Sequence, residues 1–289
     1  EKVHKKNLKK NGIILKGHKE NMYYAGRIFK LLCLDFSILD KQLKELGNKY
    51  EENLKNAEQG YKDEKKEVCR IIQRKADSYL ISGSQAIARG AISSGLEIYY
   101  AYPMTPATPV LTELAQATLE KKNQNLKVFE LENEIAVVNA GVGSAIAGKK
   151  TMVGTSGGGF DLMTEALSLC GMAEVPLVFY LAQRPGPSTG LATYTGQGDL
   201  NMARHAGHGE FSRLLIAPGD SLECEELISQ AFYFSQKYQI PSIVISDKHL
   251  AESFFTLDEK PKITPSKILT KLGRYNSYEK DPKTGSATE

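Results

Sequence analysis

The chain has 289 residues, of which 41% are hydrophobic and 25% are charged, and its formal net charge is +3. This is the composition of a soluble globular protein long enough to bury a sizeable core, and so small a net charge gives no reason to expect a nucleic-acid partner. No apolar run reaches the roughly 18 residues that a membrane-spanning helix needs, so we expect no membrane partner either.

The chain contains few cysteines. Cys33, Cys69, Cys170 and Cys224 are scattered, without CxxC pairs and without histidines at metal-ligand spacing. This pattern is typical of reduced thiols in a reducing compartment. We therefore expect a cytoplasmic protein with no metal site in this chain.

Residues 1–77 differ from the rest of the chain. A short strand is predicted at 11–17 and a short apolar helix at 21–35, and a highly charged segment with helical spacing follows from residue 37. This part has too few apolar residues for a core of its own. It is interpreted as a docking appendage or as the end of a domain that begins upstream.

From residue 78 onward, apolar strand-like runs alternate with helical periods. Strands are predicted at 97–103, 126–131, 151–156, 175–182, 213–217 and 241–247. Helices are predicted at 84–96, 110–122, 132–148, 161–173 and 221–238. Such alternation predicts an α/β fold, a doubly wound parallel sheet with helices on both faces. Ligands of these sheets bind beyond the carboxyl ends of the strands.

The segment after the first of these strands reads YPMTPATP, residues 102–109. Threonine is a good N-cap and proline suits the first helical turn, so Thr105-Pro106 or Thr108-Pro109 can simply begin the next helix. A threonine held at such a position can also present its hydroxyl to an anionic or carbonyl ligand. The segment alone leaves both interpretations open.

Two carboxylates, Glu132 and Glu134, lie in the first turn of the helix predicted at 132–148. Acidic residues in a first turn commonly complement the helix dipole. We expect an apolar stripe through Leu131, Ile135, Val138, Val142 and Ile146, with Glu134 at its edge beside small residues. A half-buried carboxylate there could share a proton with a nitrogen base.

Two further segments end predicted strands. TSGGGF, residues 155–160, is either a plain tight turn or a place where the backbone around Gly157 approaches a ligand. QRPGPSTG, residues 183–190, sets Arg184 before a rigid turn, and an arginine there is either solvated or grips a carboxylate. His205 and His208 are general acid/base candidates, without a third ligand for a metal.

Taken together and in this order, the segments resemble the alpha subunit or domain of the 2-oxoacid:ferredoxin oxidoreductases. The resemblance covers about residues 78–255. It rests on YPMTPATP, FELENEIAVVNAGVGSAIAGKK, TSGGGFDLMTEALSLCGMAEVPLV, QRPGPSTG, GQGDLNMARHAGHGEF and PSIVISDKHLAE.

The resemblance implies roles for particular residues. Glu134 matches the glutamate that pairs with the aminopyrimidine N1′ of thiamin diphosphate and promotes removal of the C2 proton. Thr105 and Arg184 match the residues that contact the 2-oxoacid and its carboxylate. Tyr102, Pro103 and Gly157 match positions beside the cofactor.

The family also implies partners. The sequence has no GDG…N motif for diphosphate and magnesium and no ferredoxin-type cysteine set. In the family, magnesium and the iron–sulfur cluster belong to a beta or delta partner. The chain is therefore expected to hold only the pyrimidine end of thiamin diphosphate, and to act with a beta subunit, coenzyme A, ferredoxin and a 2-oxoacid such as pyruvate or 2-oxoglutarate.

The expected organisation has three parts: residues 1–77 as the end of a gamma-like domain and a helical linker, 78–255 as the thiamin pyrimidine-binding alpha domain, and 256–289 as a linker towards a further domain. The function implied is oxidative decarboxylation of a 2-oxoacid in anaerobic metabolism. Two alternatives stay open: another thiamin-dependent decarboxylase of the indolepyruvate type, and a non-catalytic scaffold of the same fold.

Overall fold

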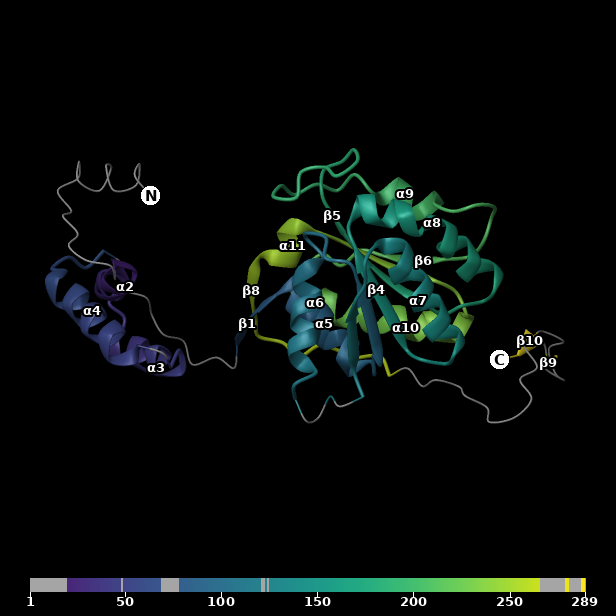
Figure 1. The fold of residues 1–289 in the computed structure, drawn as a ribbon. Helices are drawn as coiled ribbons and strands as arrows, with labels where there is room; N and C mark the ends of the chain where they lie inside the picture. The colour runs from purple at the N-terminus through teal and green to yellow at the C-terminus, as the bar shows by residue number, and fades with distance from the viewer. Residues whose placement is uncertain are drawn as a thin grey trace. The chain divides into compact units, whose positions relative to one another are not determined.

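The structure is a computed structural model that describes residues 20–47, 49–68, 78–120, 123, 125–265, 279–280 and 287–288. The chain divides into two compact units, Glu1–Ala76 and Asp77–Glu289 (Figure 1). The strand predicted at 11–17 lies outside the described residues.

The first unit is helical where it is described. It contains α2 (Glu20–Leu31), α3 (Phe36–Glu45) and α4 (Tyr50–Asp63). Helices α2 and α4 cross at a pair of glycines: a Cβ on Gly26 would lie 1.9 Å from the Ala57 carbonyl oxygen, and one on Gly60 would lie 1.8 Å from that of Tyr23. The two backbones therefore touch directly, and only glycine fits at either position.

The second unit is built on a six-stranded parallel sheet, which confirms the predicted fold class. Its strand order is β3-β2-β4-β5-β7-β6. The strands are β2 (Ile98–Ala101), β3 (Lys127–Glu130), β4 (Thr151–Thr155), β5 (Val178–Gln183), β6 (Leu214–Ile216) and β7 (Ser242–Asp247). The helices are α5 (Gly83–Ser93), α6 (Thr108–Ala117), α7 (Glu134–Ile146), α8 (Gly157–Met172), α9 (Leu200–His205), α10 (Ser221–Tyr238) and α11 (Lys248–Glu252).

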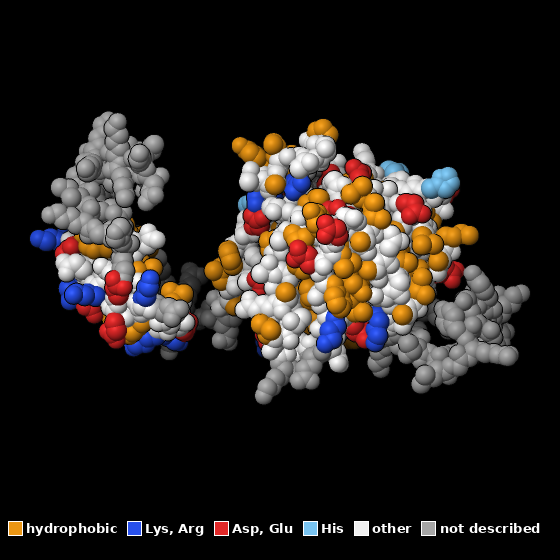
Figure 2. Space-filling view, in the orientation of Figure 1, with side chains coloured by type: hydrophobic (Ala, Val, Ile, Leu, Met, Phe, Trp, Pro, Cys, Tyr) orange, Lys and Arg blue, Asp and Glu red, His pale blue; other side chains and the backbone are white. Residues whose placement is uncertain are grey.

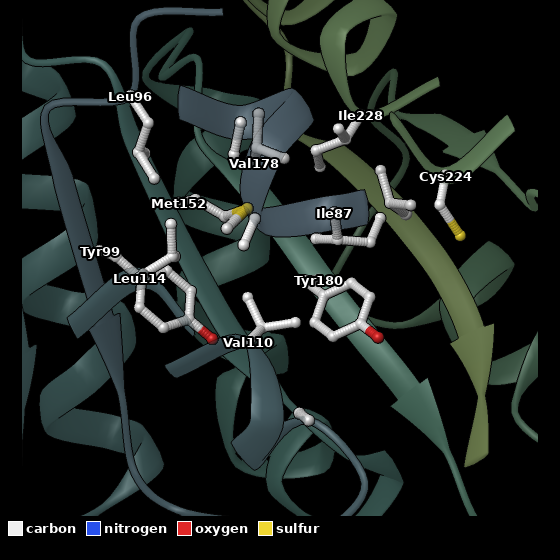
Figure 3. Packing of buried hydrophobic residues seen from close by; sticks show 14 of the residues in the cluster. Ile87, Leu96, Tyr99, Val110, Leu114, Met152, Val178, Tyr180, Cys224 and Ile228 are labelled. Atoms are coloured by element: carbon white, nitrogen blue, oxygen red, sulfur yellow. The ribbon is translucent and has the colours of Figure 1, made fainter. Parts of the chain in front are cut away.

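The helices cover both faces of this sheet, and each face has its own core. On one face, α5, α6 and α10 pack over strand residues such as Tyr99, Met152 and Tyr180 (Figure 3). On the other, α7, α8 and α9 pack over residues such as Phe179 and Ile243. Strands buried on both faces favour apolar residues on both sides, which explains the apolar runs 178–182 in β5 and 243–245 in β7.

The order of the strands creates a crevice. The chain leaves β2 through α6 towards one face of the sheet, and it leaves the neighbouring strand β4 through α8 towards the other face. The carboxyl ends of β2 and β4 therefore border a topological switch point, the place where open α/β sheets bind ligands.

Smaller elements complete the described part. Strands β1 (Tyr79–Ser82) and β8 (Phe254–Leu257) form an antiparallel pair, and β9 (Glu279–Lys280) pairs with β10 (Ala287–Thr288). Within the described ranges, each helix is too short or too polar to span a lipid bilayer.

The helix start predicted at Thr108-Pro109 is confirmed, because α6 begins at Thr108 with a proline in its first turn. The capping role is not: the cap residue is Ala107, and no side chain caps the helix. The apolar stripe predicted for α7 is wrong, because Ile135 and Ile146 are 51% and 65% exposed. The buried face contains Glu134 in the first turn, followed by Val137, Val138, Gly141, Val142 and Ala145.

Candidate functional site

The residues singled out from the sequence lie where neighbouring strands of the sheet end. Thr105 follows β2 and Arg184 follows β5, and these two strands flank β4. Arg184 Nη1 donates a hydrogen bond to the Thr105 carbonyl oxygen at 2.7 Å. This contact spans the carboxyl end of β4 and brings together two residues that are far apart in the sequence.

Arg184 is buried, with only 7% of its surface exposed. The described part of the chain contains no carboxylate within ion-pair distance of it, and within that part its side chain donates one hydrogen bond, to the Thr105 carbonyl oxygen. A guanidinium has five N–H donors in a fixed fork. Buried charges are ordinarily paired, so Arg184 has donors left for an anionic ligand such as a carboxylate.

Glu134 is the first residue of α7. Asn133 caps the helix, because its side-chain oxygen accepts the N–H of Ala136 at 2.9 Å. Glu134 is 3% exposed, and among the described residues its Oε1 has no hydrogen-bond partner. An unpaired buried carboxylate oxygen is costly, so Glu134 is suited to receive a hydrogen bond from a ligand.

The glycine turn at the start of α8 packs against Glu134. A Cβ on Gly159 would lie 2.6 Å from Glu134 Oε1 and 2.1 Å from Thr155 Oγ1. The absence of a side chain at Gly159 therefore makes room for the carboxylate.

Gly157, two residues earlier, has a similar neighbour. A Cβ there would lie 2.5 Å from Asp199 Oδ2, which is buried and has no hydrogen-bond partner among the described residues. Burial, together with the nearby charge of Asp161, raises the pKa of Asp199. Two carboxyl groups, Glu134 and Asp199, thus lie against the glycines of this turn.

The remaining predicted residues are more exposed. Tyr102 and Pro103, directly after β2, are both exposed, and Tyr102 is 39% exposed. His205 ends α9 and His208 lies in the turn beyond it, and both imidazoles are exposed. The His208 backbone N–H donates to Ser168 Oγ at 2.6 Å, which fixes that turn to α8.

Two residues at this edge, Gln183 and Asp247, were assigned no role from the sequence. Gln183 is buried beside Arg184, and its Nε2 donates to the Ser246 carbonyl oxygen at 3.1 Å. Asp247 ends β7 and caps α11 by accepting the Leu250 N–H at 2.9 Å. The position of Asp247 at a strand end was the one signal that could have drawn attention to it.

The described ranges contain no group of three or more histidine, cysteine or acidic side chains that could hold a metal ion. The site therefore consists of a buried carboxylate, a buried arginine and a hydroxyl-bearing turn around the switch point. Such a set can bind a ligand with a hydrogen-bond donor at one end and a carboxylate at the other.

Comparison with known families gives a match over most of the second unit. Residues 89–286 match the family described as pyruvate flavodoxin/ferredoxin oxidoreductase, thiamine-diphosphate-binding. The region that matches begins in α5 and includes the strand ends, the glycine turn and Arg184.

Curated relatives match a similar part of the chain. The alpha subunit of a 2-oxoacid:ferredoxin oxidoreductase from Saccharolobus solfataricus is 41% identical over 189 residues, which are 62% of this chain and 30% of that protein. The 2-oxoglutarate synthase subunit KorA from Methanothermobacter marburgensis is 35% identical over 197 residues, 67% of this chain and 52% of that protein. The chain thus spans about half of these relatives or less.

A solved structure is also similar. It is a 2-oxoglutarate:ferredoxin oxidoreductase from Magnetococcus marinus with 2-oxoglutarate, coenzyme A and succinyl-CoA bound. The TM-score is 0.79 at 32% sequence identity, and the match covers 94% of this chain and 50% of that one.

Proposed function

Because the chain belongs to the pyruvate flavodoxin/ferredoxin oxidoreductase family through its thiamine-diphosphate-binding region, we propose that it is the alpha part of a thiamin-diphosphate-dependent 2-oxoacid:ferredoxin oxidoreductase. The reaction is oxidative decarboxylation of a 2-oxoacid to an acyl-CoA, with electrons passed to ferredoxin through a partner subunit. The names of the relatives and the 2-oxoglutarate and succinyl-CoA bound in the similar structure support this activity and this substrate class.

The observation that carries the proposal is the unpartnered, buried Oε1 of Glu134. The aminopyrimidine ring of thiamin carries a nitrogen that a carboxyl group can pair with, and the Glu134 carboxylate, held against Gly159, has an oxygen without a partner among the described residues. The residues therefore fit the pyrimidine end of the cofactor. When bound, thiamin diphosphate supplies the nucleophilic carbon that adds to the 2-oxo group. Glu134 holds and exchanges the proton at the ring nitrogen.

Arg184 and Thr105 are assigned to the substrate. One N–H of the Arg184 guanidinium is used by the Thr105 carbonyl, and the others are directed to the 2-oxoacid carboxylate. The contact also fixes the turn that carries the Thr105 hydroxyl, which we assign to the reacting end of the substrate. Tyr102, Pro103 and Gly157 border the same crevice and are assigned to the cofactor.

The surface of the second unit supports a partner subunit. Helices α7 and α8 expose Ile135, Ile146, Leu162 and Met172, and hydrophobic side chains gather on the face that Figure 2 shows. Exposed apolar patches commonly mark protein–protein contacts. We assign this face to a beta subunit that holds magnesium, the diphosphate end of the cofactor and the iron–sulfur cluster.

The two units are proposed to belong to different functional parts of one longer chain. The first unit is proposed to be the end of a gamma-like domain with its linker, as expected from residues 1–77. Coverage of 94% of this chain by the similar structure supports a counterpart for both units in that relative.

The proposal is tested on the complete complex, co-expressed with its partner subunits and assayed anaerobically for CoA-dependent viologen reduction with a panel of 2-oxoacids. Glu134→Gln should lower kcat by a factor on the order of 100 or more, while assembly of the complex is unchanged. The matched control is Glu132→Gln, because Glu132 lies two residues before Glu134 and is exposed. Turnover by the Glu134→Gln complex at the parent rate would exclude the assigned role.

A non-catalytic scaffold is the alternative of a different class. A scaffold would have no use for a buried carboxylate oxygen without a hydrogen-bond partner, or for a buried arginine without a carboxylate partner, among the described residues, since each costs free energy in the folded state. If the assembled, cofactor-loaded parent complex reduces viologen with none of the 2-oxoacids, the scaffold or an indolepyruvate-type decarboxylase replaces the present proposal.

A further inference from the structure

The loop between β5 and α9, residues 184–199, begins with Arg184 and returns to the sheet at its far end. Near that end, Gln197 Nε2 donates to Asp247 Oδ2 at 2.6 Å, and Thr195 Oγ1 donates to Asp247 Oδ1 at 3.4 Å. The Asp199 backbone N–H donates to Gln183 Oε1 at 2.9 Å. The closing end of the loop is thus held by residues at the ends of β7 and β5.

Asp247 is well placed to hold the loop. It is 9% exposed, and the oxygen that receives Thr195 also accepts the Leu250 N–H of α11. Burial opposes its ionisation, but hydrogen bonds from Gln197 and from the backbone N–H groups of Leu250 and His249 outweigh burial and hold the pKa of Asp247 below its usual range. Both of its oxygens therefore remain hydrogen-bond acceptors at neutral pH.

The start of the loop is closed by backbone contacts around Pro185. The Leu191 N–H donates to the Pro185 carbonyl oxygen at 2.9 Å. Gly190 has a φ of +66°, and a Cβ there would lie 1.9 Å from the same oxygen. The Arg184 end is therefore a compact turn. It packs against the far end of the loop, because a Cβ on Gly196 would lie 3.0 Å from Pro185 N.

The side chain of Gln197 is little restrained by packing. It is exposed, and it borders a cavity of about 180 Å³ that Leu200, Ile245 and Asp247 also line. Empty space on one side of Gln197 means that few van der Waals contacts resist its movement. The hydrogen bond to Asp247 is thus the restraint on this side chain.

We propose that Asp247 is a positioning residue for substrate binding, which acts by clamping Gln197 and Thr195 so that the loop keeps Arg184 oriented at the end of β4. This rests on the proposed function, in which Arg184 receives the carboxylate of a 2-oxoacid. A loop that is already ordered loses little conformational entropy when the substrate binds. Loss of the clamp should therefore raise KM more than it lowers kcat.

The test uses Gln197→Glu in the complete complex. This variant sets a second carboxylate against Asp247, and the repulsion opens the clamp at pH 8. The KM for the 2-oxoacid should rise on the order of tenfold, since hydrogen bonds to a charged acceptor are lost, with a smaller change in kcat. At lower pH two adjacent carboxyl groups share a proton, so the variant's KM should return towards that of the parent.

Other titratable groups near Asp247 do not account for the expected pH dependence of the KM ratio. His249, Cys224 and Tyr180 are the titratable groups near Asp247. Burial raises the pKa of both Cys224 and Tyr180, so these two stay neutral. His249 is present in both the parent and the variant, so the comparison is made as the ratio of their KM values at each pH.

The matched control is Thr193→Glu, which adds the same charge to an exposed position of the same loop. Its KM should stay within about twofold of the parent at every pH, as expected for exposed charges. A second measurement, limited proteolysis of the full chain, does not depend on turnover. At pH 8, cleavage within residues 188–197 should be faster in Gln197→Glu than in the parent or Thr193→Glu.

The outcomes distinguish this proposal from the proposed function. Absence of turnover by the parent complex removes the 2-oxoacid assignment, while the proteolysis result still decides whether Asp247 clamps the loop. Parent-like KM and parent-like cleavage in Gln197→Glu at pH 8 would overturn the clamp. Equal effects of Gln197→Glu and Thr193→Glu would also overturn it, because they would reflect charge alone.

Discussion

Gly159 offers a sharp test of how the candidate site is packed. It is the third residue of α8, and a Cβ there would lie 2.1 Å from Thr155 Oγ1 and 2.6 Å from Glu134 Oε1. Thr155 and Glu134 are 1% and 3% exposed, so neither side chain can move into solvent. Gly159→Ala should therefore force a shift at the centre of the site.

Two opposing effects set the size of the change. Alanine is favoured over glycine in a helix by about 1 kcal/mol, whereas overpacking a dense core costs about 1–3 kcal/mol. With two contacts far inside van der Waals distance, the upper part of that range applies. The net loss should be about 1–2 kcal/mol, which lowers the Tm of a domain of this size by about 2–8 °C.

Differential scanning calorimetry of the full chain measures this loss. The control is Gly143→Ala in the middle of α7, because no atom lies within 4 Å of a Cβ at that position. Gly143→Ala should stabilise the protein by about 0.5–1 kcal/mol. A Gly159→Ala protein as stable as the parent would refute the packing described for Glu134.

Three further predictions concern other parts of the chain. Arg184→Lys should raise the KM for the 2-oxoacid by at least about tenfold in the complete complex, because lysine has no fork of donors; an unchanged KM would contradict the assignment. Burial raises the pKa of Glu225, so the folded state binds its proton more tightly and stability falls as pH rises above about 4.5; Glu225→Gln should flatten the dependence of Tm on pH, and equal slopes would contradict this. Gly60→Ala sets a Cβ 1.8 Å from the Tyr23 carbonyl oxygen and should lower the thermal transition of the first unit alone; an unaltered transition would show that α2 and α4 can separate without cost.

The sequence predicted the sheet well because strands covered on both faces need apolar residues throughout. The run that became β5 is apolar up to its last residue, and the run that became β7 is apolar from Ile243 to Ile245. Helix α7 was harder. Ile135 and Ile146 are apolar yet exposed, while Glu134 is charged yet buried. A rule that places apolar side chains towards the core therefore predicts the wrong buried face for this helix.

The contacts that organise the site had no local signal. The hydrogen bond from Arg184 to the Thr105 carbonyl and the one from Gln197 to Asp247 depend on which strands are neighbours. Strand order follows from the complete packing of the sheet, and side-chain periodicity does not encode it. The resemblance to a known family pointed to Thr105, Glu134 and Arg184. It assigned no role to Asp247.

The bond between Arg184 and Thr105 also has a consequence for how the protein is made. It joins positions 79 residues apart, and β2, β4 and β5 must all be paired before the two can meet. Contacts between distant residues form slowly, because a long stretch of chain must be ordered first. A nascent chain carries Thr105 well before Arg184 has been synthesised. We therefore expect helical structure to appear early in refolding and this contact to appear among the last, so the chain reaches its native secondary structure before it has a binding site.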